Sequence, residues 1–198
     1  MQRRSRVLCH QASMNSKPIL RASLEIDLPA ISTIYAHYVL NSTATFELVP
    51  PDAPEMAQRR RQVLERGLPF LVAEIDGNVA AYAYAVPYRT RAGYRFTVED
   101  SIYTHPNFLG RGIGRLLLPA LIENCEKASC RQMVAVIGGQ NNAASIRLHR
   151  LFGFQHVGVL KSVGFKFGNW LDTVFMQRAL GAGNTTFPDD AQVLPVTP

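Results

Sequence analysis

Three alternating glycines in residues 109–115, which read L-G-R-G-I-G-R, suggest a site that binds an anion. They follow a stretch with strand-like alternation, 98–103, and they precede an apolar helical pattern. A glycine-rich turn between a strand and a helix directs backbone N–H groups and the helix N-terminus toward a phosphate. Arg111 and Arg115 add positive charge there. The sequence therefore predicts a phosphate-binding loop.

Two common nucleotide-binding loops do not fit this stretch. The loop of nucleoside-triphosphate enzymes needs Gly-Lys followed by Ser or Thr, which the sequence lacks. The dinucleotide fingerprint is spaced G-x-G-x-x-G after a buried parallel strand, whereas the spacing here is G-x-G-x-G after a strand with one polar face. From the loop alone, a tight turn without a ligand remains the alternative.

Composition limits the class of protein. The chain has 198 residues, 47% of them hydrophobic and 18% charged, which is typical of one globular domain. No apolar run is long enough to span a membrane. Its three cysteines form neither a disulfide framework nor a metal-binding spacing, as expected of a cytoplasmic protein without a metal. The net charge of +6 is scattered and not interleaved with aromatics, so it favours small anionic ligands over nucleic acid.

The order of the expected elements predicts the fold class. It is a strand, two helices, three strands, a helix, a strand, a helix and two strands, and therefore an α+β fold with a mixed sheet and helices on both faces. The expected strands are 19–22, 70–75, 79–86, 98–103, 133–137, 155–160 and 170–178, and the helices begin near residues 28, 50–54, 113 and 142. We expect loops at 43–47 and 161–169, a basic leader at 1–17, one domain over 18–181 and a loose tail at 182–198.

Some side-chain placements also follow from the pattern. Leu64 and Leu151 are expected to face the core, and the arginines of 59–61 to lie on a solvated helix face. Pro119 inside the third helix should cost about 3 kcal/mol or bend the helix.

Residues 109–114 resemble the coenzyme A pyrophosphate loop of the GNAT acetyltransferase superfamily, Q/R-x-x-G-x-G/A. Leu109 departs from the first position, but the backbone donors are kept. A second segment, Asn142 to Ser145 followed by His149 to Phe154, resembles the family's N-x-x-A/S and Y-x-x-x-G-F/Y. The resemblance implies the GNAT fold, acetyl-CoA as cosubstrate, and a hydrogen bond from Asn142 to the pantetheine arm. A plain helix cap at position 142 would also favour asparagine, so the two roles of Asn142 are compatible.

Further segments of the sequence restrict the resemblance to one branch of the superfamily. His149 occupies the position of the family's tyrosine that protonates or steadies the departing thiolate. With 97–101, 135–138 and 164–172, it makes the chain similar to the phosphinothricin and methionine sulfoximine N-acetyltransferases. This implies acetyl transfer to the α-amino group of a small amino-acid analogue.

Acylation of an amine by a thioester needs a neutral amine, a polarised carbonyl and a protonated leaving thiol. Glu99 is the candidate base, because it lies on the strand that leads into the glycine loop and burial would raise the pKa of its carboxyl; the alternative is a salt-bridged strand carboxylate. His149 is the candidate proton carrier, since imidazole titrates near neutrality, with a buried structural histidine as the alternative. Tyr103 is a second possible acid, although a core aromatic is the simpler interpretation.

The remaining site residues fall into two groups. The coenzyme is expected on the backbone of the strand end and on the loop: Ile102, Tyr103, Thr104, Leu109, Gly110, Arg111, Gly112, Ile113, Gly114, Arg115 and Asn142. The carboxylate of the acceptor needs a cation, which Arg89 and Arg91 could supply. The resemblance implies that the acceptor contacts Arg89, Thr90, Arg91, Glu99, Asp100, Ser101 and Lys166, and Phe46 is expected in the same pocket. In the related branch the segment containing Lys166 closes over the acceptor, often from a partner subunit, which implies a homodimer.

Two rival functions are a GNAT enzyme for another amine (a protein N-terminus, a polyamine or an aminoglycoside) and an acyl-CoA-binding sensor without catalysis. A cationic acceptor would need an acidic pocket, whereas 89–95 is basic. The intact Glu99, Asn142 and His149 disfavour the sensor. The expected partner is thus a small-molecule amine, with no nucleic acid and no membrane.

Overall fold

The computed structural model describes residues 16–139 and 142–188, so most of the expected leader and tail lies outside the described residues. The strands are β1 (Ile19–Ala22), β2 (Phe70–Ile75), β3 (Asn78–Pro87), β4 (Thr97–Thr104), β5 (Gln132–Gly138), β6 (Gln155–Lys166) and β7 (Asn169–Ala179). The helices are α1 (Leu28–Asn41), α2 (Ala53–Glu65), α3 (Gly114–Lys127) and α4 (Ala143–Leu151), with short 3-10 turns η1 (Glu25–Asp27), η2 (Ala92–Tyr94) and η3 (Pro106–Phe108). The expected order of elements is confirmed.

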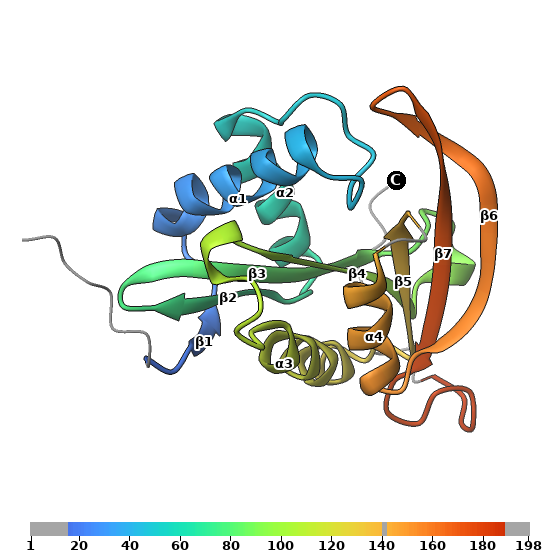
Figure 1. Cartoon of the computed structure of the whole chain (residues 1–198). Helices are drawn as coiled ribbons and strands as arrows, with labels where there is room; N and C mark the ends of the chain where they lie inside the picture. The colour runs from blue at the N-terminus through green and yellow to red at the C-terminus, as the bar shows by residue number, and fades with distance from the viewer. Residues whose placement is uncertain (1–15, 140–141, 189–198) are drawn as a thin grey trace, which may run out of the picture.

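The strands form one sheet in the order β1-β2-β3-β4-β5-β7-β6, in which only the β4–β5 pair is parallel. Figure 1 shows α1 and α2 on one face of this sheet and α3 and α4 on the other. Fully buried side chains from both faces and from the sheet make the core, among them Ile31, Tyr82, Leu117 and Met133. The α+β class with helices on both faces is therefore confirmed.

Local sequence explains where several elements begin and turn. Asp52 accepts a hydrogen bond from the Glu55 N–H and so caps α2. Asp76 and Gly77 both have positive φ and make the tight turn from β2 to β3. Helix α3 continues through Pro119, and nothing in the structure explains why a proline stands there.

Parallel pairing between β4 and β5 stops part-way along both strands. Within the described residues the register joins 97–100 to 132–135 and goes no further. Strand β4 continues for four residues beyond this point, and β3 pairs with it on its other edge as far as Thr104. The two central strands therefore diverge, and the edge of β4 from Ser101 to Thr104 is left facing a gap in the sheet.

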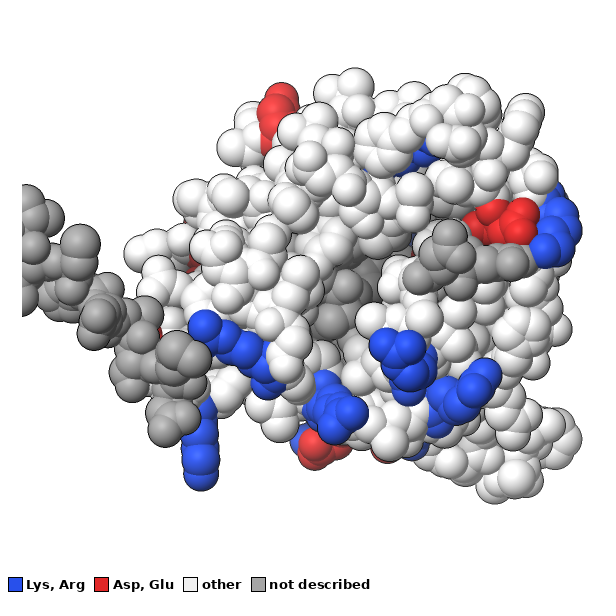
Figure 2. Space-filling view, viewed as in Figure 1, with Lys and Arg blue, Asp and Glu red and all other residues white. Residues whose placement is uncertain are grey.

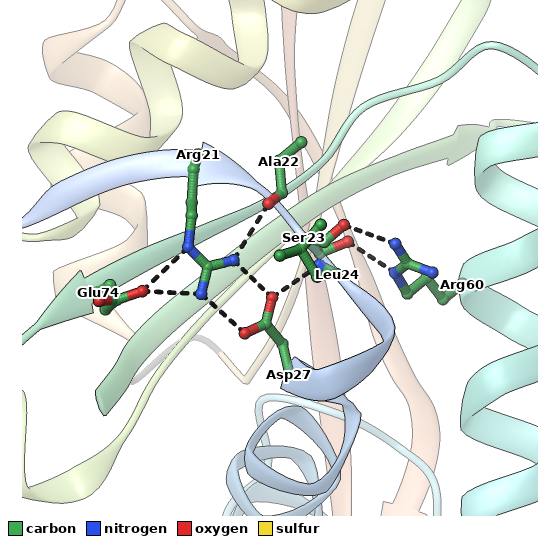
Figure 3. A network of polar contacts seen from close by, with 7 residues as sticks. All are labelled: Arg21, Ala22, Ser23, Leu24, Asp27, Arg60 and Glu74. Carbon is green, nitrogen blue, oxygen red and sulfur yellow. Dashed lines mark hydrogen bonds and ion pairs between the residues drawn. The ribbon is translucent and has the colours of Figure 1, made fainter. Parts of the chain in front are cut away.

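A polar network attaches the first helices to the sheet (Figure 3). Arg21 on β1 contacts both Asp27 at the start of α1, at 2.7 Å, and Glu74 on β2, at 2.8 Å. Arg60 on α2 donates to the hydroxyl and the carbonyl of Ser23. The hydrogen bond from Arg21 holds the pKa of Asp27 below its usual value. Ionised Asp27 therefore adds stability above the unfolded pKa of about 3.9, and this contribution is lost as the pH falls through the lower folded pKa.

The structure corrects some expected placements. The arginines of 59–61 were expected on a solvated helix face, but two of them contact other parts of the chain. Arg59 forms an ion pair with Glu47, and Arg60 donates a hydrogen bond to Ser23. Leu64 and Leu151 are exposed, not buried. In α4 the buried position belongs to His149.

The prediction of a loop at 161–169 was also wrong. Strand β6 runs to Lys166, and only a short turn separates it from β7. A register shift between Leu160 and Gly164 interrupts the alternation of the strand, with Ser162 at positive φ. Asp172 on β7 stabilises this irregularity by accepting hydrogen bonds from the Ser162 N–H and from Lys161. The result is a long hairpin at the edge of the sheet.

Candidate active site

A groove of about 500 Å³ opens where β4 and β5 diverge. The floor of the groove is the freed end of β4 together with 135–138 of β5, and its sides come from α4 and from the loop after α1. Nine residues expected in the site lie along it: Asp100, Ser101, Ile102, Tyr103, Thr104, Leu109, Gly114, Asn142 and His149. Because β3 occupies the other edge of β4, the free edge can pair with an extended, amide-bearing ligand.

The glycine loop lies at one end of this groove. Gly110 and Gly112 have φ of +76° and +74°, a conformation that favours glycine. Among the described residues, no intrachain backbone hydrogen bond uses the N–H groups of 110–114. The loop leads directly into α3, whose N-terminus carries a partial positive charge. This arrangement can bind a phosphate through the backbone alone.

Positive side chains surround the loop. Figure 2 shows Lys and Arg side chains gathered on the lower part of the visible face, over α3 and α4. The exposed arginines on these elements and on the glycine loop are Arg111, Arg115, Arg147 and Arg150. The Arg111 guanidinium lies 5.1 Å from the centre of the Phe108 ring, which limits its freedom. An anion at the loop would therefore meet cations as well as amides.

Asp100 and His149 form a buried pair at the groove. Asp100 Oδ2 lies 3.0 Å from His149 Nε2, and His149 Nδ1 lies 2.8 Å from the carbonyl oxygen of Ser145. A carbonyl can only accept, so Nδ1 carries a proton and donates it. Burial lowers the pKa of His149, but the hydrogen bond and charge of Asp100, with the Ser145 carbonyl, raise it above its usual value overall.

Asn142 begins α4 as the sequence predicts. Its side-chain oxygen accepts from the Ser145 N–H at 3.4 Å, so it caps the helix, and it also lines the groove. The cap leaves the amide nitrogen of Asn142 available as a donor toward a ligand.

Side chains alternate along β4, so Glu99 points to the face of the sheet opposite to that of Asp100 and His149. It stands opposite Val86 in the register with β3. Burial first, and the neighbouring charge of Asp100 second, raise the pKa of Glu99 to about 7, although the charge of Arg89 opposes the shift. A carboxyl with this pKa can take and release a proton near neutral pH.

A second cavity of about 320 Å³ lies on the α1–α2 face, and Val86 is part of its wall. Its deeper lining is apolar and aromatic, including Met56, Phe70, Tyr82 and Tyr84. At its rim stand arginines and a threonine from the segment after β3: Arg89, Thr90, Arg91 and Arg95. Three of these are expected acceptor residues. Glu99 itself lines neither this cavity nor the groove, but the charge of Arg89 at the rim acts on its pKa.

Tyr103 belongs to an aromatic cluster between the sheet and α1. Its ring lies 5.2 Å from those of Tyr35 and Tyr38 and 5.3 Å from that of Tyr82. Burial raises the pKa of its hydroxyl well above 10. The side chain is therefore a core aromatic, and what Tyr103 offers the groove is its backbone.

Phe46 and Lys166 line neither cavity, although the sequence places both at the acceptor. Lys166 is buried, and its Nζ donates to the carbonyl oxygens of Ser42 and Thr45. The ring of Phe46 packs against Gly138 and Gly164. Both side chains are thus engaged within the chain itself, away from Arg89.

Sequence reasoning missed one set of residues at the second cavity. Tyr35 and Arg59 line it and are joined through Glu47, which accepts from the Tyr35 hydroxyl at 2.8 Å and from Arg59 at 2.7 Å. No local signal could have revealed this link, since its members lie on α1, α2 and the loop between them. Because Glu47 neutralises Arg59, Arg89 and Arg91 are better placed to bind a carboxylate.

The residues of 34–154 match the model of the acetyltransferase (GNAT) family. The chain belongs to this family. The GNAT fold expected from the glycine loop is confirmed, and the acetyltransferase has the open, mostly antiparallel seven-stranded sheet of the family. Among its described residues there is no group of His, Cys, Asp and Glu side chains suited to a metal ion. No helix in the described ranges is long and apolar enough to cross a bilayer.

Relatives with named activities cover most of the acetyltransferase. It is 55% identical over 170 residues to a phosphinothricin N-acetyltransferase of Alcaligenes faecalis, with 86% of each chain covered. It is 42% identical over 163 residues to an L-methionine sulfoximine/L-methionine sulfone acetyltransferase of Salmonella typhimurium, covering 81% of this chain and 94% of that one. A crystal structure of a phosphinothricin acetyltransferase from Sinorhizobium meliloti in complex with AcCoA superposes with a TM-score of 0.87 at 48% identity, covering 91% and 97%.

Proposed function

We propose that this acetyltransferase transfers the acetyl group of acetyl-CoA to the α-amino group of a small amino acid or analogue, such as methionine sulfoximine, methionine sulfone or phosphinothricin. The observation that carries the proposal is the position of Glu99 on β4. Its neighbours Asp100 and Ser101 line a groove suited to coenzyme A, and Val86, its partner on β3, lines a cavity with arginines at its rim. The names of the relatives support this choice of acceptor.

Coenzyme A matches the chemistry of the groove. The N–H groups of 110–114 and the start of α3 suit its diphosphate. The free edge of β4 suits the amides of its pantetheine arm, and Asn142 offers a further donor from the opposite side. This alignment directs the thioester toward the point where β4 and β5 diverge, next to Ser101.

The acceptor fits the second cavity. Arg89 and Arg91 at its rim offer cationic forks to a carboxylate or a phosphinate. The apolar lining behind them suits the side chain of an amino acid. In this arrangement Glu99 removes a proton from the α-ammonium, and the neutral amine then attacks the thioester carbon.

His149 has the proposed role of proton carrier. When the carbon–sulfur bond breaks, the thiolate needs a proton, and His149 lines the groove. Both of its ring nitrogens contact groups of the chain, so the ring must release its contact with Asp100 or Ser145 to donate that proton. The second proton of the amine leaves to solvent. Glu99 then gives up the first proton and His149 regains one through solvent, so the products are the acetylated amine, the free thiol of coenzyme A and one net proton. Transfer is direct, without an acetyl-enzyme.

A screen of acceptors tests the proposal. We expect thiol release from acetyl-CoA with methionine sulfoximine, methionine sulfone or phosphinothricin, and none with polyamines, aminoglycosides or peptides. Arg89→Ala should raise the KM for the acceptor about tenfold or more, because it removes a charged hydrogen-bond partner, while the KM for acetyl-CoA stays unchanged. Release with a polyamine alone would support the rival enzyme, and acetyl-CoA binding without any release would support the sensor.

We also propose a homodimer in the cytoplasm. Strand β6 is an edge strand, and the end of the β6–β7 hairpin exposes large apolar side chains: Val163, Phe165, Phe167 and Trp170. Trp170 is 67% exposed, which is unusual for tryptophan in a monomer. A second copy of the chain would cover these residues.

The dimer has a direct test. Light scattering should give twice the chain mass of 22.0 kDa, and Trp170→Glu should shift the mass toward that of one chain. A wild-type mass of one chain at all concentrations would contradict the dimer. The cytoplasmic location is supported by the cysteines, which are few in the sequence, and of which the described two, Cys125 and Cys130, are buried without a disulfide.

A further inference from the structure

The first part of the loop between α1 and α2, residues 42–47, is attached to the distant β6–β7 hairpin. Lys166, near the end of β6, donates from Nζ to the carbonyl oxygens of Ser42 and Thr45, both at 2.8 Å. The side chain is buried, with the whole residue only 2% exposed. Burying an ammonium is costly unless hydrogen bonds compensate, so these two carbonyls account for the buried position of Lys166.

Phe46 provides a second attachment. Its ring occupies space that two glycines leave open, Gly138 at the end of β5 and Gly164 on β6. A Cβ added at Gly164 would collide with the ring, and one added at Gly138 would collide with the carbonyl oxygen of Thr43. Neither glycine has a positive φ, so the backbone would tolerate alanine there, and what the contact requires is space.

The same segment lines the groove and holds side chains that line the acceptor cavity. Ser42, Thr43 and Ala44 line the groove between β4 and β5. At the other end of the 42–47 segment, Glu47 holds Tyr35 and Arg59, which line the acceptor cavity. A displacement of this loop would therefore alter the groove and the acceptor cavity together.

We propose that Lys166 and Phe46 form a latch that fixes the 42–47 loop between the two cavities, which makes them positioning residues for acetyl transfer. Neither lines a cavity, so they act through the loop. The proposal rests on the proposed function, because it assigns the two cavities to the coenzyme and to the acceptor.

A glycine pair on β6 tests the latch. Gly164→Ala should expel the Phe46 ring and lower kcat/KM by about 10- to 100-fold, the scale expected when a substrate is misplaced by about 1 Å. Gly158→Ala is the matched control, since a Cβ at Gly158 meets nothing within 4 Å and its φ is also not positive. It should leave kcat/KM unchanged.

Rescue separates the latch from a general loss of structure. In Phe46→Leu/Gly164→Ala the smaller side chain leaves room for the new methyl group, so we expect part of the lost kcat/KM to return. Lys166→Met keeps an unbranched side chain of nearly the same length but removes the ammonium, and it should also lower kcat/KM. Circular dichroism should show all variants folded.

Amide hydrogen exchange of 42–47 gives an outcome that does not depend on catalysis. Exchange in this segment should become faster in Gly164→Ala and Lys166→Met but not in Gly158→Ala. If the wild type transfers acetyl and Gly164→Ala matches Gly158→Ala in kcat/KM and in exchange, the latch is refuted. If the wild type does not transfer acetyl, the proposed function fails, and the exchange pattern alone decides whether the loop is latched.

Discussion

Replacing Glu99 by glutamine is expected to lower kcat by about 10²- to 10⁴-fold, the usual contribution of a general base. The amide keeps the size of the side chain but cannot accept a proton from the α-ammonium. Glu99 faces away from the groove proposed for the coenzyme, so the affinity for acetyl-CoA should not change. Steady-state thiol release and a binding titration measure the two effects separately.

The kcat/KM of the wild type should depend on pH through the ionisation of Glu99. Burial, together with the charge of Asp100, raises the pKa of Glu99 to about 7 against the opposing charge of Arg89. The base is therefore ionised above about pH 7, and wild-type kcat/KM should fall as the pH drops below this value. Glu99→Gln should lack this limb of the profile.

Glu65→Gln is the matched control, because Glu65 is an exposed glutamate at the end of α2. It should behave as the wild type at every pH. Equal kcat for wild type and Glu99→Gln would remove Glu99 from the mechanism.

Replacing His149 by leucine is expected to lower the free energy of unfolding by about 3–5 kcal/mol, the range for breaking a buried ion pair. The change leaves the Asp100 carboxylate buried, with neither oxygen hydrogen-bonded among the described residues, because Oδ1 already has no partner there. Denaturant unfolding near pH 6 measures the loss. The double variant Asp100→Leu/His149→Leu should be more stable than His149→Leu alone, since it also removes the unpaired charge.

The stabilisation by His149 should also depend on pH. The net effect of burial, Asp100 and Ser145 is a raised pKa of His149 in the folded state. Its contribution is therefore fully present below the unfolded pKa of about 6.5, and it is lost as the pH rises through the higher folded value. A His149→Leu variant as stable as the wild type near pH 6 would show that the pair contributes nothing.

The sequence predicted those parts of the fold that depend on local pattern. Strand β2 has its predicted bounds, because a hydrophobic run ends at the Asp76–Gly77 turn. The start of α4 followed from Asn142 and its cap. The extension of β6 through 161–166 was not predictable, since its irregularity is stabilised by Asp172 from the neighbouring strand.

In the candidate site, too, only the parts that depend on local sequence could be predicted. The glycine loop and the edge of β4 are contiguous stretches, so the pattern could locate them. The Asp100–His149 pair joins residues 49 positions apart, and the sequence placed Asp100 with the acceptor instead. Lys166 was expected to bind the acceptor, but its ammonium meets backbone carbonyls of a loop more than 120 positions away, a contact that only the tertiary fold creates.

The binding of acetyl-CoA at the glycine loop is the claim on which the proposed roles of Glu99 and His149 depend. Calorimetric titration of acetyl-CoA into the wild type, Gly112→Ala and Gly67→Ala tests it most directly. Both glycines have positive φ, +74° and +68°, and a Cβ at either meets nothing within 4 Å, so the two substitutions impose the same backbone strain. We predict that the wild type and Gly67→Ala bind alike and that Gly112→Ala binds at least about tenfold more weakly, a difference of about 1.4 kcal/mol. Absence of binding by the wild type, or equal affinity in all three proteins, would contradict a coenzyme site at this loop.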